Sequence, residues 1–305
     1  MKNRSLRGSL LLTLGSMIWG AAFVAQRMGM DHMGPFTFTG IRMLLAAVMM
    51  LPVIAVSDRI RKKRGEHGGR RRGQWKAGLI CGLFLFVATS LQQVGLVYTS
   101  AGKAGFITAL YVVLVPVAAW LLGRQSPGRL VWISVAAAVT ALYLLCMPSE
   151  AFEIQLGDAL VLGCALCFTG QILAVDHYAG SVDGVRLSCM EFLVTGGIAM
   201  VIALCTETIT AEGIREALIP ILYTGIMSSA VGYTLQILGQ KDTNPTVASL
   251  LMCLEAVFAV LTGVLVLGER LSGREIAGCL LMFGAVVLAQ LAPMLARRAR
   301  HARGA

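Results

Sequence analysis

Hydrophobic positions in this chain come in long runs, and polar positions gather in the short segments between them. Each run holds about twenty residues, which as an α-helix cross a hydrocarbon core of about 30 Å. Most of the runs lack the polar face that a soluble helix turns toward water. The pattern predicts ten membrane spans, at residues 8–28, 35–56, 77–97, 103–122, 129–147, 157–176, 187–206, 217–239, 246–267 and 275–294.

The composition supports this interpretation. The 305 residues are 57% hydrophobic and 14% charged, with a mean hydropathy of +0.76. A soluble domain averages about 45–50% apolar and about 25% charged residues. We therefore predict an all-α integral membrane protein, in preference to an unusually apolar soluble helical protein.

The two halves of the chain repeat each other. Each half holds five spans, an odd number, so the second half enters the membrane from the side opposite to the first. The prediction is two inverted five-helix repeats, at residues 8–147 and 157–292. The first two spans of each half align at an offset of 149, which pairs Arg42 with Glu191. The clearest matches are Leu91/Leu235, Gln92/Gln236, Gly95/Gly239 and Thr99/Thr243 at an offset of 144, and Gly123/Gly268, Gly128/Gly273 and Arg129/Arg274 at 145.

The basic residues lie mainly on one side of the predicted spans. With the N-terminus in the cytoplasm, twenty Lys and Arg residues fall in cytoplasmic segments and four at the other face. Nine of the twenty lie in the loop 57–76, and four lie in the tail 295–305. Cytoplasmic loops of membrane proteins carry such an excess, so both termini are predicted to be cytoplasmic. The net charge of +10 comes from basic residues in cytoplasmic segments, where they set the orientation of the chain in the membrane. Nucleic acid is therefore not an expected partner.

Inverted repeats are typical of secondary transporters, which bind substrate where the repeats meet. Charged residues within such spans are costly and need a reason. Glu255, near the middle of the ninth span, is a candidate proton-binding carboxylate or a partner for a cationic group of the substrate; a structural hydrogen-bond acceptor is the alternative. Arg42 and Glu191 either exchange partners as access alternates or each anchor a helix end by snorkelling to the interface.

Amides and aromatic rings supply further cavity candidates. Gln92 and Gln236 are symmetry mates whose amides could hold a polar substrate or bond helix to helix. Trp19, Tyr111 and Tyr233 are candidate aromatic lining.

Other chemistry is not indicated. The eight cysteines fall in or beside apolar runs, where they are expected to act as small core side chains. Cys164-x-x-Cys167 has no second ligand pair nearby, so no metal is expected. The sequence contains no G-x-x-x-x-G-K-[ST] and no H-E-x-x-H. Neither an ATP-driven pump nor an enzyme is expected, and no cofactor is implied.

Five motifs stand out in the two repeats: Trp19-Gly20-x-x-Phe23, Arg42, Phe106-x-x-Ala109-Leu110-Tyr111-x-x-x-x-Pro116, Leu254-Glu255 and Leu267-Gly268-Glu269-Arg270-Leu271. With these motifs the chain resembles the drug/metabolite transporter superfamily, EamA type, over both repeats. The family pattern usually has a proline directly after the position of Glu255. Ala256 stands there in this chain, so a break in the ninth helix is not predicted.

The resemblance implies an inner-membrane carrier that exports a small metabolite such as an amino acid. It implies a central cavity lined by spans 1, 3, 4, 6, 8 and 9, and a structural role for Arg42. Expected partners are the substrate, the lipid bilayer and protons, with a homodimer as a further hypothesis. The resemblance supports as cavity residues Trp19, Gln92, Tyr111, Gln236 and Glu255.

Three other functions remain open. A drug-efflux or nutrient-uptake carrier of the same fold would be favoured by a cavity rich in aromatic rings and poor in charge. A membrane interaction or lipid-handling protein without transport would need neither the repeats nor Glu255. An open channel would show no saturable rate and no counterflow.

Overall fold

The computed structural model describes residues 2–63, 73–99, 101–123, 128–146, 155–267 and 272–303. Ten helical segments in these ranges are long and apolar enough to cross a membrane, and the described ranges contain no strand, so the predicted all-α membrane fold is confirmed. The helices of the first half are α1 (Lys2–Met30), α2 (Pro35–Lys63), α3 (Gln74–Tyr98), α4 (Ala101–Ala109), α5 (Tyr111–Leu121) and α6 (Arg129–Cys146). Those of the second half are α7 (Leu156–Ala179), α8 (Gly184–Thr206), α9 (Ala211–Glu216), α10 (Leu218–Leu222), the π-helical η1 (Tyr223–Tyr233), α11 (Thr234–Gln240), α12 (Pro245–Met252), α13 (Leu254–Leu267) and α14 (Gly273–Arg303).

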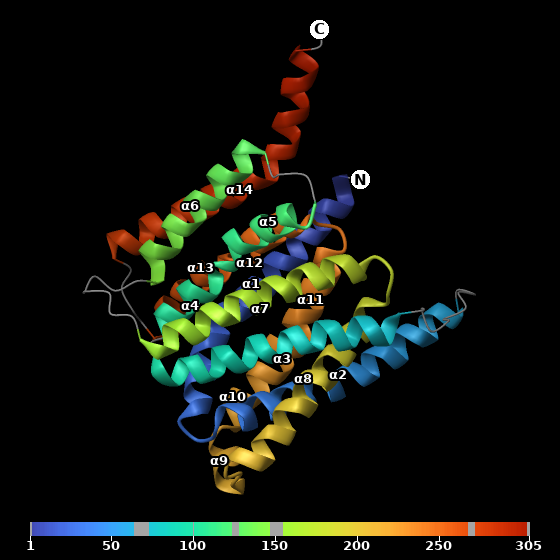
Figure 1. Ribbon diagram of the computed structural model, residues 1–305, viewed down its shortest axis with the longest axis vertical. Coiled ribbons are helices and arrows are strands. Elements are labelled where there is room, and N and C mark those ends of the chain that lie inside the picture. Colours follow the sequence, from blue (N-terminus) through green and yellow to red (C-terminus); the bar gives the residue numbers. More distant parts are fainter. Residues whose placement is uncertain are drawn as a thin grey trace.

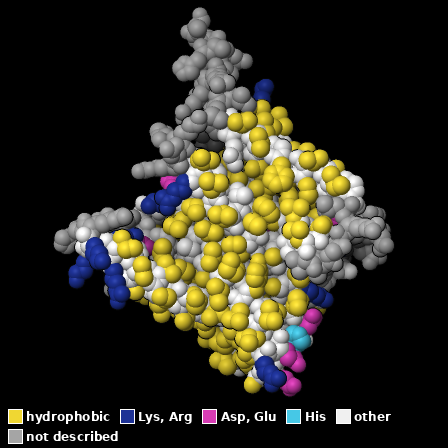
Figure 2. All heavy atoms as spheres, turned by 180° about the vertical axis from the view of Figure 1, so that it is seen from behind, with side chains coloured by type: hydrophobic (Ala, Val, Ile, Leu, Met, Phe, Trp, Pro, Cys, Tyr) yellow, Lys and Arg dark blue, Asp and Glu magenta, His cyan; other side chains and the backbone are white. Residues whose placement is uncertain are grey.

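The outer surface of the bundle is apolar. Figure 2 shows a face covered by hydrophobic side chains, with charged side chains confined to its edges. Large side chains such as Leu204, Ile219 and Leu280 are more than two-thirds exposed. Contiguous apolar surface of this extent suits lipid rather than water.

Equivalent spans of the two halves pack against equivalent neighbours. The pairs α2–α8 and α6–α14, which lie side by side at opposite edges of Figure 1, map onto themselves. The contact of α3 with α7 corresponds to the contact of α1 with η1 and α11. This is the neighbour pattern expected of two inverted five-helix repeats.

Two glycine crossings show the repeat at residue level. A side chain on Gly95 of α3 would meet Val161 at 2.6 Å and the Gly157 carbonyl of α7 at 3.2 Å. In the second half, a side chain on Gly239 of α11 would meet Leu12 at 2.8 Å and the Gly8 carbonyl of α1 at 2.9 Å. Both glycines let two helix backbones approach closely, as small residues do in membranes.

Span 8 contains one residue more than its counterpart α3. Gly82 packs against Val194 and the Glu191 carbonyl, and Gly225 packs against the equivalent Leu45 and Arg42 carbonyl. Gly95 lies 13 residues after Gly82, whereas Gly239 lies 14 residues after Gly225. The extra residue is taken up by η1, because a π-helix holds an insertion without breaking the segment.

Spans 4 and 9 are each interrupted near their middle. The interruptions fall at Leu110, between α4 and α5, and at Cys253, between α12 and α13. The break at Cys253 was not predicted, because Ala256 replaces the usual proline. It arises from a tightened turn, in which the Ala256 amide donates to the Cys253 carbonyl three residues back. Pro116 does not end α5, which continues to Leu121.

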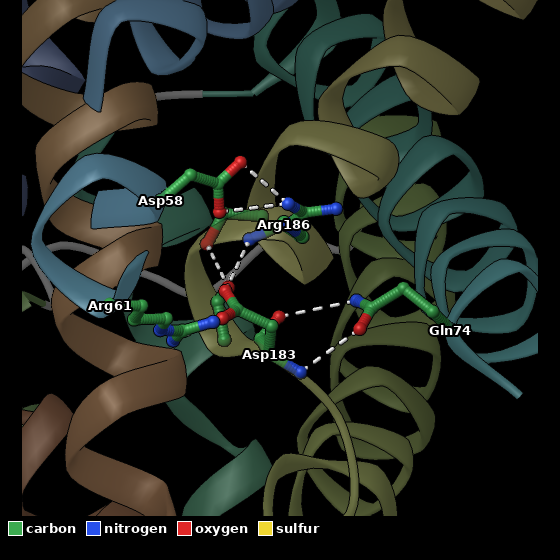
Figure 3. A network of polar contacts seen from close by, with 7 residues as sticks. Asp58, Arg61, Gln74, Asp183 and Arg186 are labelled. Atoms are coloured by element: carbon green, nitrogen blue, oxygen red, sulfur yellow. Dashed lines mark hydrogen bonds and ion pairs between the residues drawn. The ribbon is translucent and has the colours of Figure 1, made fainter. Parts of the chain in front are cut away.

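Polar contacts join α2, α3 and α8 at the face where α1 begins, which we call the N-terminal face (Figure 3). Both Asp58 carboxylate oxygens accept from Arg186 Nη2, at 2.8 and 2.7 Å. Arg61 forms an ion pair with Asp183. Gln74 donates to the Asp183 carbonyl at 3.2 Å and accepts from its amide at 2.9 Å. These contacts hold the ends of three spans together.

At the opposite face, α2 and α8 are joined in an equivalent way. There the Glu207 carboxylate accepts from the Phe36 amide at 2.9 Å, the Thr37 amide at 2.7 Å and the Thr37 hydroxyl at 2.6 Å. Glu207 lies 149 residues after Asp58, and Arg186 lies 149 residues after Thr37. The same two positions of the repeat therefore join the pair at both ends.

Candidate functional site

A cavity of about 50 Å³ lies at the junction of the two halves, with room for a few water molecules. Residues from seven spans line it: the six spans expected from the resemblance and also α2. The structure brings together around this cavity all of the predicted cavity candidates, Trp19, Gln92, Tyr111, Tyr233, Gln236 and Glu255, and also Arg42.

Tyr111 and Glu255 meet where the interrupted spans 4 and 9 cross. The Tyr111 hydroxyl donates to Glu255 Oε1 at 3.4 Å, and the Cys253 thiol donates to the Ala109 carbonyl at 3.6 Å. The partners in each contact are 144 residues apart, the offset of the repeat, which is the separation expected of contacts on the pseudo-two-fold axis of two inverted repeats. Glu255 is 8% exposed and lines the cavity, and its Oε2 has no hydrogen-bond partner among the described residues.

Arg42 and Glu191 are both enclosed within the protein, at 2% and 0% exposure, so neither snorkels to the surface. Arg42 lines the cavity, and its Nε and Nη2 are buried with no hydrogen-bond partner in the described part of the chain. Its guanidinium lies 5.8 Å from the centre of the Phe38 ring. Glu191 Oε1 accepts from Gln171 at 2.7 Å, while Oε2 is buried and unpartnered. The two charges form no ion pair in this structure, and their exchange of partners stays a prediction.

The two symmetry-related amides bond helix to helix and also line the cavity. Gln92 donates to the Thr108 hydroxyl at 3.1 Å. Gln236 donates to Gln171 Oε1 and to Gln240 Oε1, each at 3.0 Å. The side-chain oxygens of Gln92 and Gln236, two residues that line the cavity, accept no hydrogen bond from the described residues.

An aromatic wall fixes one side of the cavity. The rings of Trp19 and Tyr233 lie 5.1 Å apart, and Phe192 packs edge-on against Tyr233 at 6.2 Å. Trp19 Nε1 donates to the Ser228 carbonyl of η1 at 3.0 Å. The extra residue of span 8 therefore lies in the segment that positions Trp19.

Sequence reasoning missed other lining residues, among them Gln26, Thr108, Phe168 and Ser228. Gln26 could have been found, because it lies seven residues after Trp19 and so on the same face of α1. Ser228 could not, because no sequence signal marked the π-helical segment. The motif Gly268-Glu269-Arg270-Leu271, residues 64–72 of the loop 57–76 and the side chains of the tail 295–305 lie outside the described residues.

Known proteins resemble the chain along its length. A transporter of Archaeoglobus fulgidus, described as uncharacterized, is 30% identical over 94% of this chain and 87% of its own. YedA of Escherichia coli K12, an uncharacterized inner membrane transporter, is 23% identical over 92% of this chain and 89% of its own. The threonine/homoserine exporter RhtA of Salmonella typhimurium is 26% identical over 53% of this chain and 54% of its own.

A solved crystal structure shares the fold, with a TM-score of 0.76 at 18% identity, over 95% of this chain and 98% of that chain. The EamA-like transporter family matches both halves, at residues 6–147 and 155–291. The ten apolar helices and the inner membrane relative indicate a multi-pass inner membrane protein. The chain belongs to the EamA-like transporter family.

Proposed function

We propose that this protein is a secondary active transporter that exports a small metabolite, such as an amino acid, by alternating access. The observation that carries the proposal is the central cavity, where charged and amide side chains of both halves meet inside an apolar bundle. Binding at a repeat junction can be reached from either side of the membrane. The six predicted cavity residues are proposed to contact the substrate.

The direction and orientation belong to the same proposal. Both termini lie in the cytoplasm, because the segments that share the N-terminal face carry most of the basic residues. The relative RhtA is named an exporter, which supports outward movement of an amino acid. Glu255 binds a coupling proton when the substrate is absent, since an unpaired carboxylate at mid-membrane is costly.

A drug-efflux or uptake carrier is the second candidate. The aromatic wall of Trp19 and Tyr233 favours it. The charges of Arg42 and Glu255 disfavour a drug carrier, because a purely apolar drug would leave both charges unpaired.

Comparing metabolites in cells with and without the protein tests the proposal. We expect a small polar compound to accumulate in the medium only when the protein is present. Equal levels of amino acids, nucleosides and sugars in both cultures would contradict metabolite export and would favour drug efflux or uptake.

A further inference from the structure

The polar groups of the cavity that lack a complete set of partners lie at different depths between the two faces of the bundle. Gln26 lies four residues before the end of α1 and Arg42 seven residues after the start of α2, both toward the face opposite the N-terminal face. Gln236 lies four residues before the end of α11, at the N-terminal face, and Glu255 lies ten residues after the start of α12. The unpaired guanidinium therefore lies toward one face, and the carboxylate of Glu255 lies near the middle.

The donor end carries a positive charge with no counter-charge. Arg42 lines the cavity, and two of its nitrogens are buried without partners among the described residues. Gln26 is 5% exposed and lines the same end; its Oε1 is buried without a partner among the described residues, and its Nε2 donates no hydrogen bond there. A guanidinium beside an amide donor is suited to a carboxylate, which accepts several hydrogen bonds in one plane.

The acceptor end is fixed by a chain of amides. The Ile172 carbonyl can only accept, and it receives Gln240 Nε2 at 3.1 Å, so Gln240 turns its oxygen toward Gln236. Gln171 donates to the Glu191 carboxylate and likewise turns its oxygen toward Gln236. Both amide hydrogens of Gln236 are used, and only its oxygen is left for a ligand.

Glu255 completes this acceptor end. One carboxylate oxygen accepts from Tyr111, and the other has no partner among the described residues, although Glu255 lines the cavity. A carboxylate and an amide oxygen together are suited to an ammonium group, which has three hydrogens to donate. Gln92 keeps one amide hydrogen and its oxygen free, so it can serve either end of a ligand.

We infer that the cavity is a two-ended site for a zwitterion. Arg42 and Gln26 hold its anionic group toward the face opposite the N-terminal face, and Glu255 and Gln236 hold its ammonium group. Gln171 and Gln240 are positioning residues that set the polarity of Gln236. This inference rests on the proposed function, because it takes the cavity to be the substrate site.

The test measures ligand binding to the purified protein as a rise in the protein's unfolding temperature. Each of the twenty amino acids is compared with its methyl ester, which lacks the carboxylate, and with its desamino acid, which lacks the ammonium group. We expect at least one amino acid to stabilise the protein, and both analogues to bind at least about tenfold more weakly.

The variants assign the two ends. In Arg42→Gln and in Gln26→Leu the preference for the amino acid over its ester should disappear, while the preference over the desamino acid remains. In Glu255→Gln the reverse is expected. Arg42→Lys should restore part of the ester discrimination, which loss of folding alone would not. Matched controls are Arg27→Gln, whose arginine bonds the Leu96 carbonyl, and Gln93→Leu; neither residue lines the cavity.

Binding of no amino acid, or ester discrimination unchanged in Gln26→Leu and Arg42→Gln, would overturn the inference. Flux in proteoliposomes separates it from the proposed function. Binding as expected without flux would contradict transport and leave the two-ended site standing. Saturable flux of an uncharged compound, with no amino acid bound, would contradict the two-ended site and leave transport standing.

Discussion

At the scale of single residues, Glu255 is the group on which the proposed coupling depends. It is bonded to Tyr111, which lies one repeat offset earlier in the chain, and no cation of the described chain is paired with it. A buried carboxylate without a cationic partner is stable only when it is protonated or bound to a ligand. Proton and substrate would then compete for one carboxylate, which is a simple way to couple their movements.

Replacing Glu255 with Gln tests this competition. The amide keeps the shape and can still accept from Tyr111, but it does not take up a proton. We expect transport to lose its dependence on pH while the protein remains folded in the membrane. Flux would be measured in proteoliposomes at several pH values, with Glu216→Gln, a change at the exposed ion pair with His32, as control. A pH dependence like that of the unchanged protein would exclude the proton role.

The sequence predicted these residues because charges, amides and aromatic rings stand out within apolar spans. It did not predict which of their atoms face the cavity. For Gln236 that depends on the Ile172 carbonyl and on Glu191, which belong to two other spans. Which end of the Gln236 amide is left free is set by contacts between helices, which the sequence does not show.

At the scale of elements, η1 is the main departure from symmetry. Its counterpart in α3 is a regular α-helix with one residue fewer between equivalent packing glycines. The repeat was visible from residue 91 onward, but Gly82 and Gly225 alone were too weak a match to show the change of offset. The break at Cys253 was hidden for a related reason, since no proline or glycine marks it.

Deleting Ser229 would give span 8 the same spacing as α3. We expect the segment to become α-helical and the protein to fold, because both packing glycines keep their partners. Transport should fall by up to about a hundredfold, since the Ser228 carbonyl no longer meets Trp19 and the cavity wall shifts. Folding would be followed by size-exclusion chromatography and helix content, and transport by flux.

The matched control deletes Ala88 from α3, which shortens that span below the common spacing and should prevent folding. A Ser229 deletion that transports normally would show that the extra residue has no role in the cavity.

At the scale of the whole molecule, the α2–α8 pair is joined at both faces by equivalent carboxylates. Three donors at the start of α2 are satisfied by Glu207, which also places a negative charge at a helix N-terminus. Asp58 and Glu207 are also separated by 149 residues, but the sequence analysis did not single out this pair, and only the structure shows that both join the same two helices.

Glu207→Ala should therefore lower the free energy of unfolding by about 1–2 kcal/mol, the usual cost of losing a helix cap. Thermal unfolding in detergent would measure it. Glu212→Ala is the control, because that side chain is exposed and forms no hydrogen bond with the described residues. Equal unfolding temperatures for the two variants would exclude a stabilising role for Glu207.

The proposed orientation can be tested with single cysteines in a chain from which the eight native cysteines are removed. Ala211→Cys lies on the face opposite the N-terminal face and should react with a membrane-impermeant maleimide in intact cells. Ser181→Cys, on the N-terminal face, should react only after the cells are permeabilised. The reverse result would place both termini outside the cytoplasm.

Counterflow in proteoliposomes tests the central claim most directly. Vesicles loaded with one unlabelled amino acid at a time would be diluted into a trace of the same labelled compound. Transport by alternating access predicts transient, saturable accumulation of label for at least one amino acid, strongly reduced in Arg42→Gln and unchanged in Arg27→Gln. Absence of counterflow for every amino acid, or an unsaturable leak, would contradict the account.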